Sequence, residues 1–270
     1  LAQPTIGENV AVIGAGLIGQ ICIQLLQANG CRVFSVDTNA ERCAMAESFG
    51  AVAVVLFKHK DVVDAANQFT GGCGMDAVII AASTQSNEVI QAAAHMSRKR
   101  GRIVLVGSVG LKLQRDDFFK KELTFQVSSS YGPGRYDPNY EDKGQDYPLP
   151  FVRWTAQRNF QAVLQMMSNG RLDVESLISH RLPIEEAPRA YSLLYDPSSI
   201  GIVLNYESGD ERNLGETTIV FKQHRTRSVE SSNDRIVVGV IGAGNYVSRI
   251  LIPALNKVDV ILDTLVAGDG

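Results

Sequence analysis

Three glycines near the start of the chain have the spacing that a phosphate-binding turn requires. Gly14, Gly16 and Gly19 follow residues 9–13, an apolar run that predicts a buried parallel strand. In such a turn the first glycine allows the tight bend, the second lets a pyrophosphate approach the backbone, and the third lets the next helix pack close to the strand. The free N–H groups at the start of that helix then face phosphate oxygens. The spacing therefore predicts dinucleotide binding.

An acidic residue stands where the second predicted strand, residues 32–36, comes to its end. The carboxylate of Asp37 can accept both hydroxyls of an adenosine ribose, and it would repel a 2′-phosphate. Thr38 follows without a neighbouring base, whereas Arg42 comes one helical turn further on. The sequence therefore favours NAD as the cofactor, and Arg42 keeps NADP as the alternative.

The elements that must position these residues alternate regularly through the first half of the chain. Strands are predicted at residues 9–13, 32–36, 51–57, 76–81, 102–106 and 123–127. Helices are predicted between them at residues 17–29, 41–49, 60–70 and 87–96, with a short helical turn at 116–121. This rhythm predicts an α/β fold with a doubly wound, six-stranded parallel sheet of the Rossmann type, in the strand order 3-2-1-4-5-6.

Ligands bind such a sheet over the carboxyl ends of its strands. This rule adds the residues that follow the fourth, fifth and sixth strands, although ordinary turn chemistry would also explain them. The first group should lie near the adenosine or its ribose, and the other two near the nicotinamide. The full set of candidate cofactor-binding residues is Gly14, Gly16, Leu17, Ile18, Gly19, Asp37, Thr38, Arg42, Ala81, Ala82, Ser83, Val106, Gly107, Ser108 and Ser129.

Beyond residue 130 the regular alternation stops. Residues 131–150 form a long predicted loop rich in tyrosine, proline and charge. We expect it to form a wall of a substrate pocket, with Arg135 and the tyrosines as polar contacts; an ordered surface loop without a ligand is the alternative. A helix, a strand, a helix and a strand are then predicted at residues 159–167, 177–182, 184–194 and 200–206.

The pattern divides the chain into four parts. Residues 1–130 are predicted to form an NAD-binding domain, and residues 131–206 a return segment. Residues 207–234 are polar and are expected to be a linker with one short strand, whereas residues 235–270 repeat the opening strand and glycine turn. The repeat has Val247 in place of the third glycine, which predicts an incomplete second Rossmann unit. Its short length and the absence of an initiator Met indicate a piece of a longer polypeptide.

Composition and charge argue against several classes of partner. The 270 residues carry a formal charge of −3, which gives no reason to expect nucleic acid or an anionic membrane surface. No apolar run reaches the roughly 18 residues that a membrane helix needs. The cysteines show no C-x-x-C pair and no histidine at ligand spacing, which predicts no metal site and buried or half-buried free thiols in the cytoplasm. They are Cys22, Cys31, Cys43 and Cys73.

Several stretches resemble the cofactor-binding half of the medium-chain, zinc-type alcohol and polyol dehydrogenases. They are residues 14–19, 36–37, 101–107 and 180–187. The resemblance covers roughly residues 1–206 and implies that residues 131–206 pack on a catalytic domain that this sequence does not contain. The zinc ligands and acid–base residues of that family lie in that other domain, so we expect neither catalytic nor metal-binding residues here.

The resemblance also implies an activity and an assembly. The whole enzyme would be an oxidoreductase that transfers hydride between a nicotinamide cofactor and an alcohol, polyol or sugar substrate. An exposed edge at the sixth strand would permit a homodimer, as the family often forms. The tail, residues 238–255, is similar to the opening of sugar dehydrogenases of the glucose-fructose oxidoreductase and inositol dehydrogenase type.

Two classes of protein share the opening motif and are the alternatives. A non-catalytic Rossmann module that senses NAD would have the same glycine turn, but it would not need the return segment at residues 177–206. A methyltransferase-like fold is less well supported, because the full three-glycine spacing favours a pyrophosphate ligand. We therefore expect the cofactor-binding part of an enzyme.

Overall fold

The computed structural model describes residues 1–55, 59–206, 236–242, 244 and 246–266. The chain divides into two compact units, Leu1–Ser208 and Gly209–Gly270. The predicted linker at 207–234, with its short strand, lies outside the described residues. None of the helices in the described part of the chain has the length and apolar character that crossing a bilayer requires.

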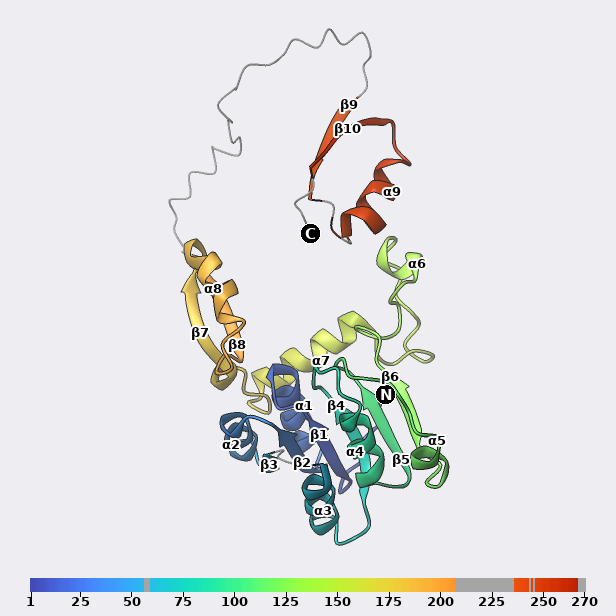
Figure 1. The fold of residues 1–270 in the computed structure, drawn as a ribbon, viewed down its shortest axis with the longest axis vertical. Helices are drawn as coiled ribbons and strands as arrows, with labels where there is room; N and C mark the ends of the chain where they lie inside the picture. Colours follow the sequence, from blue (N-terminus) through green and yellow to red (C-terminus); the bar gives the residue numbers. More distant parts are fainter. Residues whose placement is uncertain (56–58, 207–235, 243, 245, 267–270) are drawn as a thin grey trace. The chain divides into compact units, whose positions relative to one another are not determined.

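A six-stranded parallel sheet forms the centre of the first unit (Figure 1). Its strands are β1 (Asn9–Ile13), β2 (Arg32–Asp37), β3 (Val52–Val55), β4 (Met75–Ile80), β5 (Ser97–Leu105) and β6 (Thr124–Val127). Their order is β3-β2-β1-β4-β5-β6, which confirms the predicted doubly wound Rossmann fold. β5 begins at Ser97, earlier than predicted, because Ser97 pairs with Met75 even though charged residues follow it.

Helices cover both faces of this sheet, and the strands supply side chains to both. Val10 and Val12 of β1 pack in a core with α1 (Leu17–Ala28) and α2 (Ala40–Ser48). Ala11 and Ile13 of the same strand pack in a second core with α3 (His59–Phe69) and α4 (Glu88–Met96). Since successive side chains of a strand point to opposite faces, a continuous apolar run becomes a strand that is buried on both sides.

The segment after β6 contains more regular structure than the sequence predicts. The 131–150 stretch is not a loop throughout: a short helix, α6 (Pro138–Glu141), forms where Asp137 accepts a hydrogen bond from the backbone N–H of Asn139 and Pro138 occupies the first turn. The elements that follow are α7 (Ala156–Ser168), a 3₁₀ turn (Glu175–Leu177), β7 (Ile178–Pro183), a second 3₁₀ turn (Ile184–Glu186), α8 (Ala187–Leu193) and β8 (Gly201–Asn205), whereas α5 (Arg115–Phe119) precedes β6. β7 and β8 pair in parallel as a separate two-stranded sheet.

A side-chain amide attaches this later segment to the first helix. Gln24 of α1 donates from Nε2 to the carbonyl of Asp173 at 2.8 Å and accepts from the Asp173 N–H at 2.6 Å. The residue is buried, so this pair of hydrogen bonds satisfies polar groups that would otherwise be costly to bury. The segment that contains Asp173 is therefore fixed to α1.

The second unit is a small strand–helix–strand arrangement. It consists of β9 (Ile236–Ile241), a π-helical turn (Val247–Leu251), α9 (Ile252–Leu255) and β10 (Val260–Val266). β9 and β10 pair in parallel, which is the pairing from which Rossmann sheets are built. Val240 is 8% exposed whereas Ile241 is 87% exposed, because so few elements cannot bury both faces of two apolar strands.

Candidate cofactor-binding site

Two of the three turn glycines are required by the fold itself. Gly14 has a φ of +97°, and a Cβ there would lie 2.6 Å from the backbone nitrogen of Ala82 at the end of β4. A Cβ on Gly19 would lie 1.9 Å from the carbonyl oxygen of Gly14. The first glycine therefore permits the bend, and the third permits close helix–strand packing, as the spacing predicts.

Gly16 is different, because neither its conformation nor its packing requires a glycine. Its φ is −71°, which any residue adopts. The nearest atom to a Cβ built there is Nη1 of Arg42, at 4.0 Å. The open side of the backbone at Gly16 is therefore free for a ligand. Gly16 is also the N-cap residue of α1, whose N-terminus has no side-chain cap and no acidic residue in its first turn.

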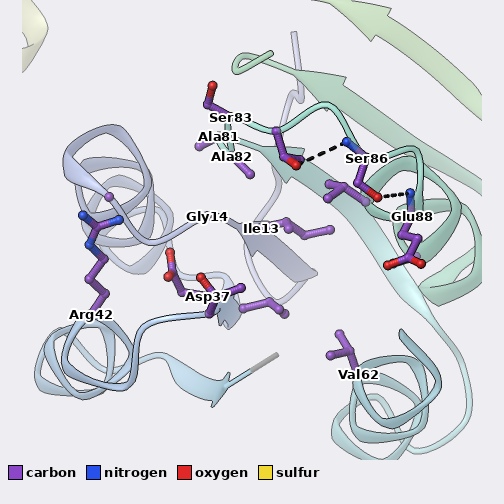
Figure 2. Close-up of a pocket in the computed structure, with 16 residues that line it drawn as sticks. Ile13, Gly14, Asp37, Arg42, Val62, Ala81, Ala82, Ser83, Ser86 and Glu88 are labelled. Atoms are coloured by element: carbon purple, nitrogen blue, oxygen red, sulfur yellow. Dashed lines mark hydrogen bonds between the residues drawn. The ribbon is translucent and has the colours of Figure 1, made fainter. Parts of the chain in front are cut away.

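A cavity of about 660 Å³ lies over the carboxyl ends of β1, β2 and β4 (Figure 2). The structure brings eight predicted site residues together in its wall: Gly14, Gly16, Asp37, Thr38, Arg42, Ala81, Ala82 and Ser83. Sequence reasoning missed eight others: Ile13, Val36, Val62, Thr84, Ser86, Glu88, Val89 and Ala92. Ile13 and Val36 end predicted strands and could have been found by the strand-end rule, whereas Val62 and Ala92 come from helices and depend on the tertiary fold.

The other predicted site residues do not line this cavity. They are Leu17, Ile18, Gly19, Val106, Gly107, Ser108 and Ser129. Gly107 has a packing reason for being glycine, since a Cβ there would lie 2.1 Å from the carbonyl oxygen of Ala82. Ser108 forms an isolated parallel bridge with Ser83, so the ends of β4 and β5 are held side by side. The expected contacts of these residues with a nicotinamide stay a prediction.

Asp37 is bound to the glycine turn, which the sequence did not reveal. Its Oδ2 accepts a buried hydrogen bond from the N–H of Ala15 at 2.6 Å, and its Oδ1 accepts from the N–H of Asn39 at 2.8 Å. The residue is only 9% exposed. An ionised carboxylate has about four lone-pair positions, so both oxygens can accept a further hydrogen bond each. Asp37 therefore both holds the turn and presents acceptors to the cavity.

Arg42 is held by the later segment rather than standing free beside Asp37. Its Nη2 donates to the carbonyl of Pro197 at 3.0 Å and to that of Ser199 at 3.4 Å.

The fully buried Gln20 of α1 donates to the backbone carbonyls of Ala15 and Arg42 at 3.0 and 2.8 Å, which ties the glycine turn to α2. Gln20 was not predicted as a site residue, and its one signal in the sequence is that it is a polar residue in a largely apolar helix.

The polar residues of the 131–150 segment bind one another. Arg135 pairs with Glu141 at 2.6 Å, and the hydroxyl of Tyr131 donates to the same carboxylate. These hydrogen bonds, led by that of Tyr131, hold the pKa of Glu141 below its ordinary value. Tyr147 likewise donates to Asp137. None of these residues lines the cavity, so their expected contact with a substrate stays a prediction.

The cysteines are free thiols in different environments. Cys31 and Cys43 are buried and Cys22 is half-buried, where burial raises the pKa of Cys22 to about 11. The expectation of a buried or half-buried thiol is wrong for Cys73, which is exposed because it lies in a glycine turn outside the packed layers.

Within the described residues, no three His, Cys, Asp or Glu side chains are grouped so that they could hold a metal ion.

Comparison with known proteins agrees with this geometry. Residues 18–142 match the family described as zinc-binding dehydrogenase. The chain is 30% identical over 202 residues to D-guloside 3-dehydrogenase of Escherichia coli (strain K12), an alignment that covers 72% of this chain and 53% of that protein. It is 26% identical over 192 residues to an uncharacterized zinc-type alcohol dehydrogenase-like protein of the same organism, covering 71% of this chain and 48% of the relative.

A solved dehydrogenase structure has a similar fold over most of this chain. The alcohol dehydrogenase TADH from Thermus sp. ATN1 superposes with a TM-score of 0.58 and 28% identity, covering 76% of this chain and 53% of that one. The chain thus spans about half the length of the curated relatives it matches. Together the matches support the resemblance to the cofactor-binding half of the medium-chain dehydrogenases.

Proposed function

We propose that this chain is the NAD-binding part of an oxidoreductase that transfers hydride between a nicotinamide cofactor and an alcohol, polyol or sugar. The observation that carries the proposal is Gly16, a glycine that the fold does not need and that faces the cavity beside an uncapped helix N-terminus. A bare backbone at that position suits a pyrophosphate. A bound nicotinamide would supply the hydride chemistry, and the residues of this chain bind and orient the cofactor.

We assign NAD rather than NADP as the cofactor. The buried carboxylate of Asp37 has acceptor positions left for the hydroxyls of a ribose, and its charge would repel a 2′-phosphate. Arg42, the residue that keeps NADP as the alternative, already donates to the carbonyls of Pro197 and Ser199. Its Nη1 lies 4.0 Å from a Cβ built on Gly16 and is better placed for the pyrophosphate.

The substrate class follows from the relatives, whose names include D-guloside 3-dehydrogenase and D-arabitol-phosphate dehydrogenase. We propose a small alcohol, polyol or sugar. Catalytic residues, and zinc if the whole enzyme uses it, would lie outside this chain. The four free thiols suit a reducing compartment, and we propose the cytoplasm.

Two features of assembly belong to the same proposal. β6 is an edge strand of the sheet, so a second copy could pair with it to form a homodimer.

Residues 235–270 would open a second dinucleotide-binding domain of the sugar dehydrogenase type. Two observations support this: β9 and β10 are parallel, and the turn after β9 begins at Gly242 with a φ of +92°.

Calorimetric titration of the 270-residue chain with NADH and NADPH, side by side, tests the proposal. We expect NADH to bind at least about tenfold more tightly, a difference of about 1.4 kcal/mol. Binding of neither dinucleotide would contradict the assignment of the cavity, whereas equal binding of both would contradict only the role of Asp37.

A further inference from the structure

The cofactor cavity differs in chemistry from one end to the other. Arg42 lies at one end, Glu88 and Val62 lie at the opposite end, and Gly14 and Asp37 lie between them (Figure 2). A cation, a carboxylate and an apolar region with a second carboxylate therefore follow one another along a single cavity.

That end has apolar walls from two helices. Val62 of α3 is 1% exposed and Ala92 of α4 is 6% exposed, and the partly buried Val89 packs against the same core. All three side chains also line the cavity. Opposed aliphatic surfaces of this kind suit the faces of a planar aromatic ring, because such a ring loses little by leaving water.

Glu88 adds one hydrogen-bond acceptor to this apolar end. It lies in the first turn of α4. The backbone N–H of Glu88 donates to Oγ of Ser86 at 3.1 Å, and the backbone N–H of Ser86 donates to Oγ1 of Thr84 at 3.2 Å. These hydrogen bonds hold the first turn of the helix in place. Within the described part of the chain, the carboxylate of Glu88 has neither a hydrogen-bond donor nor an ion-pair partner. In Figure 2 the carboxylate points toward the side of the cavity where Val62 lies.

The order of these groups matches the adenylate half of a dinucleotide, which places phosphate, ribose and base in succession. We propose that Glu88 accepts a hydrogen bond from the exocyclic amino group of adenine and so makes the site select adenine over 6-oxopurines. A 6-oxopurine such as hypoxanthine carries a carbonyl oxygen at that position, which a carboxylate repels. This inference rests on the proposed function, because it assumes that a dinucleotide occupies the cavity.

An acidic residue in the first turn of a helix can also serve only to stabilise the helix. The chain offers a matched control for that role in Glu41, which occupies the first turn of α2. Its N–H donates to the side chain of Asn39 two residues earlier, as that of Glu88 donates to Ser86. Glu41 does not line the cavity. The substitutions Glu41→Ala and Glu88→Ala therefore remove the same charge from the first turn of a helix, Glu41 being the second residue of α2 and Glu88 the first of α4.

Titration calorimetry with NADH and with reduced nicotinamide hypoxanthine dinucleotide tests the inference. We expect the wild-type chain to bind NADH about tenfold more tightly than the hypoxanthine analogue, since a hydrogen bond to a charged group is at stake. In Glu88→Ala this preference should shrink to about twofold or less, while Glu41→Ala should keep the wild-type ratio. Glu88→Gln, whose amide can donate to a carbonyl oxygen, should bind the analogue better than the wild type does.

The outcomes separate this inference from the proposed function. A wild-type ratio that persists in Glu88→Ala and Glu88→Gln would overturn the inference alone, since NADH would still bind. An equal change of the ratio in Glu41→Ala would also overturn it, because general charge rather than contact would then set the preference. Wild-type protein that binds neither dinucleotide would contradict the proposed function and this inference together. If Glu88→Ala does not fold, the Glu88→Gln ratio decides alone.

Discussion

The sharpest test of the glycine turn compares the same substitution at two of its positions. A Cβ on Gly16 would meet nothing closer than Nη1 of Arg42 at 4.0 Å, whereas a Cβ on Gly19 would lie 1.9 Å from the carbonyl oxygen of Gly14. Gly16→Ala should therefore change the free energy of unfolding by no more than about 1 kcal/mol. Gly19→Ala forces backbone apart and should cost about 3 kcal/mol.

NADH affinity should fall in Gly16→Ala, the variant whose free energy of unfolding changes little. The added methyl group at position 16 stands where the pyrophosphate would approach the backbone, so at least one charge-assisted hydrogen bond of about 1.5–3 kcal/mol is lost. We expect Gly16→Ala to bind NADH between about tenfold and hundredfold more weakly than the wild type. The bulkier Gly16→Val should abolish NADH binding while the sheet stays folded.

Denaturant unfolding and calorimetric titration of the same samples provide both readouts. Wild-type affinity in Gly16→Ala would refute the pyrophosphate site, because a ligand at that backbone could not tolerate the methyl group. Equal destabilisation of Gly16→Ala and Gly19→Ala would refute the packing argument, since it would show that both glycines serve the fold.

Two further predictions concern Asp37 and the thiols. Asp37→Ala should lower the free energy of unfolding by about 1–3 kcal/mol, because the buried N–H of Ala15 loses its acceptor. It should also weaken NADH more than NADPH, and an equal loss for both in paired titrations would mean that Asp37 does not contact the ribose. Iodoacetamide at pH 8 should label Cys73 first, as followed by mass spectrometry. Cys22, whose pKa is raised to about 11, should react appreciably only as the pH approaches 11, and fast labelling at pH 8 would contradict its burial.

The sequence by itself determined the sheet and its glycine turn. Continuous apolar runs such as residues 9–13 specify strands buried on both faces, and the six-fold alternation of strand and helix behind a glycine turn predicted the order 3-2-1-4-5-6. The spacing of Gly14, Gly16 and Gly19 likewise predicted the tight bend and the close helix. These properties are local, because they depend on backbone conformation and on side-chain periodicity within a few residues.

Tertiary structure decided which residues share the cavity. Val62 lies on α3 and Glu88 on α4. From the sequence, Val62 is only part of an apolar helix face, and Glu88 is only an acidic residue in the first turn of a helix. Whether they face a ligand depends on how α3 and α4 pack against the sheet, and on the direction in which each side chain then points. The engagement of Arg42 by Pro197 and Ser199 is likewise a contact between residues far apart in the chain.

The same limit applies to the role of Asp37. Its place at the end of β2 predicted a carboxylate near the ribose, but a sequence position does not show what else an oxygen atom contacts. The N–H of Ala15 lies 2.6 Å from the carboxylate because β1 and β2 pair in parallel and so bring the glycine turn beside the end of β2. Hydrogen bonds between distant segments depend on distance and direction in space, and only the folded chain fixes those.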